Sequence, residues 1–475
     1  MIKIKIITII VVLISFFILS YKLTSSFIFH PDFARDMFDI TRISQGKLML
    51  IGPKLTFGGI YSGPYYYYLF VPILLLSQYN IDAVLFFNTF LFSLSLGFFF
   101  YKVSTKQSFL ASILATSAFL FSPLFLIASR NPSNAFTYIP FLLILMTIIY
   151  FDDIQKPKQI LFLGIGAGII ATFHLVSISA LFFISILFLY KLKKRKHYFP
   201  YIGGFIVSFA PLFLFELKHN FIMFKNTFID KSYLMWIKNS NIPGGITGMK
   251  NSLENFFFIA KTMEKFLIIN PLILLGISTF KVHSKLIDRD KKDLLLLFSS
   301  IASLAFLAIF MRFQFIYHYL FATILLILFS TIIILSKNKL YIILFLFIAL
   351  ELAFIPKEIY LKTWREAKTY ENAVNFAIQN NLVSKSESFN IIQITNPDLL
   401  SPNGFEYRYF LQKNGYSPDS EFIYKTSKKL LLFSEKPEYD IKELDTWESR
   451  EFGREYLSKA KKYKSGKITI YVTNK

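Results

Sequence analysis

Long apolar runs separated by short basic connections dominate this sequence and limit the folds that it can adopt. A helix needs about 20 apolar residues to cross a bilayer. Hydrophobic residues make up 54% of the chain and charged residues only 17%, which is outside the range of ordinary soluble domains. The sequence therefore predicts an α-helical polytopic membrane protein with about eleven transmembrane helices. We place them at residues 4–21, 82–101, 107–128, 134–151, 159–173, 175–190, 199–217, 255–279, 293–311, 313–336 and 340–356.

Lysine and arginine in the short connections set the expected orientation, because they favour the cytoplasmic side. Lys3 and Lys5 place the N-terminus in the cytoplasm, and the basic loops at 191–197 and 281–292 are later cytoplasmic marks. We expect the first apolar run to be a retained span, since no small-residue cleavage site follows it. The protein is then expected in the plasma (inner) membrane, with a first outer loop at residues 22–81.

The segment YYYYLFVPILLLS at residues 65–77 is an exception to the pattern of spans. It is short and contains Pro72, so we expect it to lie in the outer interface or to re-enter the membrane. If it crossed instead, every later loop would change sides, and the basic connections oppose this.

Residues 357–475 differ in composition from the transmembrane domain predicted at 1–356. A helical pattern covers 361–380, and the runs FNIIQIT and KITIYVT alternate in the manner of strands. We expect a small extracytoplasmic α/β domain here.

Charge and cysteine content exclude several classes of protein. A net charge of +22 would suggest nucleic acid in a soluble protein, but here many basic residues lie in short loops between apolar runs, so we expect contacts with membrane lipids and no nucleic-acid partner. The absence of cysteine excludes disulfides, thiolate nucleophiles and cysteine-ligated metals. The glycines of GIGAGII at 164–170 are expected to allow close helix packing rather than to bind phosphate.

Ionisable residues gather on the outer side of the predicted topology. Such groups are costly at membrane depth and often mark a functional cavity. A carboxylate can act there as a general base, and arginines can hold a phosphate. For the histidines and the glutamate, interfacial or structural roles are the alternative. The set consists of Asp32, Arg35, Asp36, Arg130, His174, Glu216, His219, Arg312 and His318.

The block FHPDFARDMFDITRISQG, followed by IGPKLTFGGIYSGPYYYYL, resembles the first outer loop of GT-C type glycosyltransferases. It is most similar to glycosyltransferase family 39, in the group of protein O-mannosyltransferases and lipid A aminoarabinose transferases. Their catalytic carboxylate lies about fourteen residues before a glycine, the position of Asp32 relative to Gly46. Arg35 matches an arginine that holds the donor phosphate in the aminoarabinose transferases. Later blocks resemble these relatives in the same order up to about residue 330.

Two positions depart from the pattern of these relatives. Phe33 stands where they often have glutamate, so the role of a second carboxylate is lost or passes to Asp36. At residues 62–64 this chain has the element SGP, where the relatives often have an element with a phosphate-binding lysine. Lys54 or Arg130 would then take the place of that lysine.

The resulting hypothesis is an inverting glycosyltransferase that uses a polyprenyl-phosphate sugar donor and an extracytoplasmic lipid, glycan or protein acceptor. Asp32 is the expected base and Asp36 the second choice. Arg35, Arg130, Arg312 and Lys54 are the candidate phosphate contacts, and His174, Glu216, His219 and His318 would line the cavity. We predict no cofactor and no metal ligands, and the sequence leaves a divalent-ion requirement open. A flippase for a polyprenyl-linked substrate and an O-antigen ligase or polymerase are the alternatives.

Overall fold

The structure is a computed structural model that describes residues 2–55, 59–231, 234, 245–283, 291–395, 403–436 and 438–475. The chain forms two compact units, and both are discontinuous in sequence. Unit 1 consists of Met1–Leu23, Met49–Leu69 and Val84–Ile359, and unit 2 of Thr24–Leu48, Phe70–Ala83 and Tyr360–Lys475. Parts of residues 218–254, which connect two predicted spans, and of the predicted basic loop at 281–292 lie outside the described residues.

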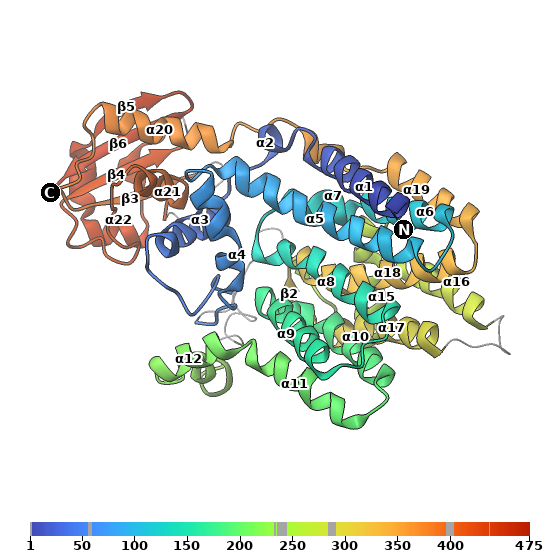
Figure 1. Ribbon diagram of the computed structural model, residues 1–475. Helices are drawn as coiled ribbons and strands as arrows, with labels where there is room; N and C mark the ends of the chain where they lie inside the picture. The colour runs from blue at the N-terminus through green and yellow to red at the C-terminus, as the bar shows by residue number, and fades with distance from the viewer. Residues whose placement is uncertain are drawn as a thin grey trace. The chain divides into compact units, whose positions relative to one another are not determined.

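Unit 1 is built almost entirely from apolar helices (Figure 1). Its two short strands, β1 (Ile246–Thr247) and β2 (Gln314–Phe315), pair antiparallel. The helices are α1 (Ile2–Ser20), α5 (Ile81–Ser104), α6 (Phe109–Leu120), α7 (Pro123–Ala128), α8 (Asn134–Phe151), α9 (Pro157–Phe173), α10 (Ile178–Lys191), α11 (Tyr198–Val207), α12 (Ala210–Lys218), α13 (Ile222–Phe224), α15 (Ser252–Leu267), α16 (Pro271–His283), α17 (Lys291–Phe310), α18 (Phe321–Lys337) and α19 (Tyr341–Ala353).

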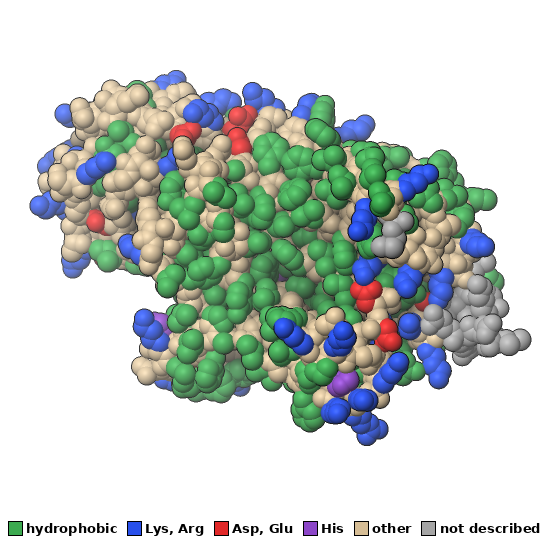
Figure 2. Space-filling view, in the orientation of Figure 1, with side chains coloured by type: hydrophobic (Ala, Val, Ile, Leu, Met, Phe, Trp, Pro, Cys, Tyr) green, Lys and Arg blue, Asp and Glu red, His purple; other side chains and the backbone are tan. Residues whose placement is uncertain are grey.

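The core of unit 1 forms around α18, whose residues are buried from Phe321 to Ser336. This helix packs against α6, α10, α16 and α17. In contrast, α1 exposes large aliphatic and aromatic side chains such as Ile9, Leu13 and Phe17. Figure 2 shows hydrophobic side chains spread over much of the surface in this view. Apolar helices with exposed apolar faces need lipid around them, so the protein is an integral membrane protein.

Some of the spans that hydropathy predicts as single helices consist of two helices in the structure. In the described part of the chain, five helices are long and apolar enough to cross a membrane, or up to seven if each bent pair counts as one span. The predicted span at 255–279 is divided between α15 and α16, which meet at an angle of 91°. The predicted span at 107–128 is divided before Pro123, where Ser122 caps the N-terminus of α7. The number of about eleven crossings stays a prediction.

Two of the three glycines of α9, Gly164 and Gly168, allow it to pack closely against α11, as the sequence predicts, whereas a Cβ at Gly166 would meet nothing within 4 Å. A Cβ at Gly164 would lie 2.1 Å from the carbonyl oxygen of Tyr201, and a Cβ at Gly168 would lie 2.6 Å from that of Phe205. On the facing helix, a Cβ at Gly204 would lie 2.3 Å from the carbonyl oxygen of Leu161. Any larger residue would push the two backbones apart.

Unit 2 contains a four-stranded mixed sheet with the strand order β3-β4-β6-β5. β3 (Phe389–Ile394) pairs parallel with β4 (Lys429–Ser434), whereas β6 (Ile468–Asn474) pairs antiparallel with β4 and with β5 (Lys461–Ser465). β3 and β6 cover the two runs with strand-like alternation. Three α-helices accompany the sheet, namely α20 (Ala367–Gln379), α21 (Phe405–Lys413) and α22 (Trp447–Phe452).

A helix from the N-terminal part of the chain, α3 (Pro31–Ser44), belongs to the same unit and packs against α21. The ring of Phe29, just before α3, packs against those of Tyr370 and Phe410 at centroid distances of 5.7 and 5.6 Å. The backbone N–H of Phe29 also donates to the carbonyl of Arg365. The segment that contains the acidic cluster is therefore held by residues more than 300 positions later in the sequence. Two further helices, α2 (Leu23–Ser26) and α4 (Tyr65–Leu76), belong partly to each unit, and the first residues of α5, up to Ala83, also belong to unit 2.

Candidate functional site

Helix α3 begins at a sequence that specifies a helix N-terminus. The Nδ1 atom of His30, the N-cap residue, accepts a hydrogen bond from the backbone N–H of Phe33 at 3.3 Å. Pro31 follows at the first helical position, where its fixed φ favours the helix. Asp32 then lies in the first turn, where the helix dipole stabilises a negative charge.

Arg35 joins the two predicted carboxylates into one cluster. Its Nη1 atom lies 3.0 Å from Oδ1 of Asp32, and its Nη2 atom lies 3.0 Å from Oδ1 of Asp36. The side chain of Asp32 is 76% exposed, whereas that of Asp36 is 2% exposed. The cluster thus contains one carboxylate that is open to an incoming molecule and one that is enclosed.

Burial raises the pKa of Asp36 from 3.8 to about 7, although the charge and the hydrogen bond of Arg35 act in the opposite direction. Asp36 is then close to half protonated at neutral pH. Asp32 is the carboxylate of the cluster that can reach a substrate, and it accepts a hydrogen bond from the Nη1 atom of Arg35 at 3.0 Å. The geometry favours Asp32 over Asp36 as a base.

Phe33 occupies a core position rather than a surface one. Its side chain is fully buried, and its ring makes edge contacts with Phe27 at 5.1 Å and Phe29 at 5.8 Å. A glutamate here would place a charge among aromatic rings. The residue that departs from the pattern of the similar enzymes therefore anchors α3.

The other predicted site residues belong to unit 1, and most of them serve identifiable structural contacts. Arg130 is buried, and its Nη1 atom donates to the carbonyls of Leu19 and Tyr21 at 3.1 and 2.9 Å, near the end of α1. Glu216 accepts hydrogen bonds from the backbone N–H groups of Met223 and Phe224 at the start of α13.

His219 has a local role that is similar to that of Glu216. Its ring stacks on Phe215 at 4.1 Å, and its Nδ1 atom lies 2.8 Å from the carbonyl oxygen of that residue. Its contacts thus lie within one helical turn, and they explain the residue without a ligand.

Arg312 and Lys54 are exposed cations on loops. The Nε atom of Arg312 donates to the carbonyl of Ile309 at 2.8 Å. The buried side chain of Asn255 fixes this loop by donating to the carbonyls of Ala308 and Met311. Sequence reasoning missed Asn255, because a lone asparagine gives no signal until its partners are known.

His174 and His318 meet in an aromatic cluster. Their rings lie 5.2 Å apart, and the ring of Tyr138 stacks parallel to His174 at 5.9 Å. His174 is 5% exposed, and its Nδ1 atom has no hydrogen-bond partner among the described residues. A buried imidazole with an unused nitrogen can receive a hydroxyl from a ligand.

The loop with the SGP element joins this cluster. The backbone N–H of Gly63 donates to the carbonyl of Thr172, two residues before His174, at 2.8 Å. The hydroxyl of Tyr66 donates to the carbonyl of Pro132, two residues after Arg130, at 2.6 Å. Unit 1 therefore collects several of the predicted residues at one end of α8 and α9. The ion-pair cluster of α3 belongs to unit 2.

Unit 1 also contains an apolar cavity of about 810 Å³ between α4, α5, α8 and α9. It extends along most of α9, from Gln159 to Phe173, and along α8 from Phe141 to Asp152. Asp152 pairs with Lys102 at 2.7 Å beside the cavity. Its lining is almost entirely apolar, which suits a hydrocarbon chain. No group of three or more potential metal ligands occurs in the described ranges.

No protein-family model and no curated protein match the sequence. Solved structures match the fold, and they show that the chain has the GT-C fold of membrane glycosyltransferases, as predicted. ArnT from Cupriavidus metallidurans, in a crystal structure bound to undecaprenyl phosphate, matches with a TM-score of 0.62 and 10% identity. The match covers 98% of this chain and 97% of ArnT.

A second structure supports the same fold over a smaller share of a larger protein. The arabinofuranosyltransferase AftD from mycobacteria matches with a TM-score of 0.50 and 9% identity, over 98% of this chain and 40% of AftD. Identities this low establish the fold and leave the reaction to be argued from the residues.

Proposed function

We propose that the protein is an inverting glycosyltransferase that moves a monosaccharide from a polyprenyl-phosphate donor to an acceptor on the outer face of the plasma membrane. The N-terminus would lie in the cytoplasm. The observation that carries the proposal is the exposed carboxylate of Asp32, paired with Arg35, on helix α3, which lies shortly after the first apolar segment of a GT-C fold.

Asp32 would accept the proton from an acceptor hydroxyl or amine. The freed electron pair forms the new bond to the anomeric carbon, while the bond from that carbon to the phosphate oxygen breaks. Polyprenyl phosphate leaves with the electrons of that bond. Arg35 would stabilise the charge that develops on the phosphate, as bidentate guanidinium contacts can.

The donor lipid accounts for a second feature. The apolar cavity beside α9 suits a polyprenyl chain, and in ArnT the bound molecule is undecaprenyl phosphate. The exposed cations Lys54 and Arg312 are further candidates for the phosphate, whereas the contacts of Arg130 favour a structural role. The sugar and the acceptor stay open.

The experiment measures release of polyprenyl phosphate by the purified full chain with labelled polyprenyl-phosphate sugars and an acceptor extract. Asp32→Asn should lower turnover by at least about 100-fold, because a general base commonly contributes that much. Asp445→Asn, which removes an exposed carboxylate that pairs with Arg450 and Arg454 in the same unit, is the matched control and should stay within a few-fold of the wild type.

Wild-type turnover in Asp32→Asn would exclude Asp32 as the base. Release of polyprenyl diphosphate instead of the monophosphate would favour the ligase or polymerase alternative. Adding a chelator to the same assay decides whether a divalent ion is needed.

A further inference from the structure

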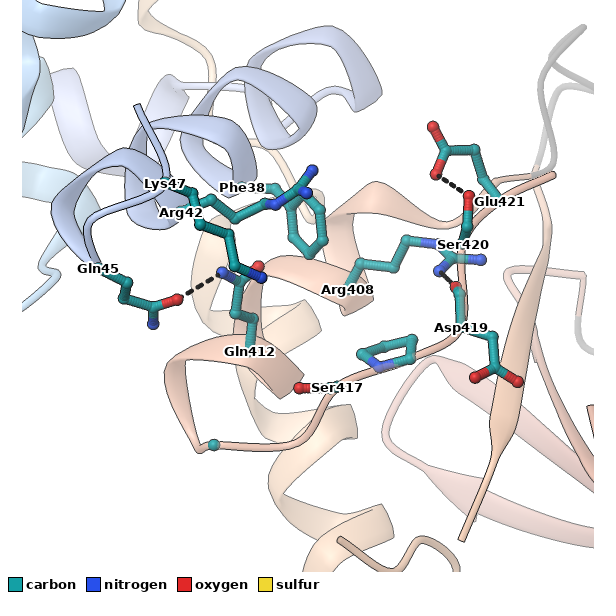
Figure 3. A pocket seen from close by; sticks show the side chains of 12 residues that line it. Phe38, Arg42, Gln45, Lys47, Arg408, Gln412, Ser417, Asp419, Ser420 and Glu421 are labelled. Carbon is teal, nitrogen blue, oxygen red and sulfur yellow. Dashed lines mark hydrogen bonds between the residues drawn. The ribbon is translucent and has the colours of Figure 1, made fainter. Parts of the chain in front are cut away.

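Unit 2 contains a cavity of about 300 Å³ that the proposed reaction does not use. It lies between the C-terminal half of α3, helix α21 and the segment at 415–421 (Figure 3). Its volume is at the lower end of the range for small-molecule sites. Positively charged, amide and aromatic side chains line it together, from parts of the sequence that are far apart.

Three cations line the cavity. The ammonium group of Lys47 has no ion-pair or hydrogen-bond partner in the part of the chain that the structure describes. Arg42 pairs with Asp39 at 3.6 Å, and its guanidinium lies 5.8 Å from the centroid of the Phe38 ring. Arg42 lies on α3, which packs against α21, and the backbone N–H of Lys47, just after this helix, donates to the carbonyl of Arg42 at 3.0 Å.

The third cation, Arg408, is only 1% exposed. Its guanidinium donates to the carbonyls of Asn403 and Asp419, each at 2.6 Å, and to the side-chain oxygen of Asn390. No carboxylate pairs with it among the described residues. A buried charge without a counter-ion is costly, so an anion in the adjoining cavity would be stabilised.

The position of Arg408 depends on the glycine that begins α21. Gly404 has a left-handed backbone with φ of +64°, and a Cβ there would lie 2.7 Å from the side chain of Ile391. The sequence therefore fixes the start of the helix, and with it the arginine one turn later.

The two carboxylates of the cavity lining have other partners. That of Asp419 accepts hydrogen bonds from the hydroxyls of Ser388 and Ser427. That of Glu421 lies 3.4 Å from the hydroxyl of Ser420, and Figure 3 shows it directed toward that residue. Neither carboxylate pairs with Arg42 or Lys47 among the described residues.

Two glutamines add hydrogen-bonding groups. The Nε2 atom of Gln412 donates to Oε1 of Gln45 at 3.2 Å, which aligns the two amides. The Oε1 atom of Gln412 is buried and has no donor among the described residues. An unmet acceptor suits a ligand hydroxyl, and the ring of Phe38 offers an apolar surface beside it.

We propose that this cavity binds a saccharide unit that carries a phosphate or carboxylate group, as part of the acceptor. Cations recognise the anionic group, and the amides and the ring recognise the hydroxyls and the carbon face of the sugar. The assignment to the acceptor rests on the proposed transferase function, whereas the binding site does not.

The test is saturation-transfer NMR titration of the full chain in detergent with four probes: glucose 1-phosphate, glucuronic acid, glucose and inorganic phosphate. The two charged sugars should bind at least about tenfold more tightly than either glucose or inorganic phosphate. The double variant Arg42→Gln/Lys47→Gln should weaken them at least about tenfold, the usual loss for a charge-assisted contact.

The matched control is Lys459→Gln/Lys464→Gln, which removes the charges of two exposed lysines of the same unit that do not line the cavity. It should bind the charged sugars within twofold of the wild type. If the double variant proves unstable, Lys47→Gln alone serves, because that side chain is exposed and without a partner in the described part of the chain.

Three results would overturn the proposal. The first is that glucose binds as tightly as the charged sugars, and the second is that inorganic phosphate does so. The third is that the control variant loses as much affinity for the charged sugars as Arg42→Gln/Lys47→Gln does. The binding titration contains no polyprenyl-phosphate sugar, so its result does not depend on the transferase reaction. The binding proposal can therefore fail while the transferase proposal holds, and the reverse. If both hold, Arg42→Gln/Lys47→Gln raises the acceptor KM at unchanged kcat, and Asp32→Asn keeps sugar binding while it loses turnover.

Discussion

The buried carboxylate of Asp36 predicts an unusual dependence of stability on pH. Its pKa rises from 3.8 to about 7 on folding because burial outweighs the attraction of Arg35. The unfolded chain releases this proton near pH 4, while the folded chain holds it to about pH 7. Between these values the folded state binds more protons, so the free energy of unfolding falls as the pH rises.

The size of the effect follows from this difference. Inside the window, one extra bound proton changes the free energy of unfolding by about 1.4 kcal/mol per pH unit. Integrated from pH 5 to pH 7, the contribution of Asp36 falls by about 2 kcal/mol. For a unit of this size, that corresponds to a decrease in Tm of roughly 5 °C.

The assay compares Tm of the wild type and of Asp36→Asn in detergent at pH 5, 6 and 7. The variant has no titratable group at this position, so a changed contact with Arg35 shifts its whole curve without adding a slope. The readout is therefore the slope, and the Tm of the variant should fall less steeply than that of the wild type. Parallel curves would refute a raised pKa for Asp36.

A second buried acid in unit 2 serves as an internal comparison. Burial also raises the pKa of Glu406 to about 7. Its contribution has the same sign and falls in the same window, so Glu406→Gln should flatten the curve independently. The double variant Asp36→Asn/Glu406→Gln should show the smallest change of Tm with pH.

Two further variants test the roles that the contacts assign. Phe33→Glu should prevent accumulation of folded protein, because the charge would be buried against Phe27 and Phe29 at a cost of at least about 3 kcal/mol. Phe33→Leu is the control. A folded, active Phe33→Glu protein would contradict the core role of Phe33. Arg130→Gln should lower the free energy of unfolding by about 1–3 kcal/mol, because it weakens the donor to two carbonyls. Arg312→Gln, at an exposed site, should change it by about 0.5 kcal/mol or less. An unchanged Tm in Arg130→Gln, together with a raised donor KM, would instead favour a phosphate contact.

The sequence by itself determined the properties that depend on local pattern. Apolar runs of fixed length require a membrane, and the resemblance of the first outer loop, with Asp32, Arg35 and Gly46, to GT-C glycosyltransferases predicted the fold. The three-residue and four-residue spacings of Asp32, Arg35 and Asp36 place them on one side of a helix, because these spacings approximate one helical turn. The glycines of α9 likewise predicted close packing, since only a missing Cβ permits it.

The tertiary structure decided how much water reaches each of these groups. Asp32 and Asp36 are the same residue type one turn apart, yet one is exposed and the other is buried, because α3 packs against a helix that lies over 360 residues later. The same long-range packing made Phe33 a core residue and brought Lys47 beside Arg408 in one cavity. Burial is a property of contacts between distant segments, so no local pattern contains it.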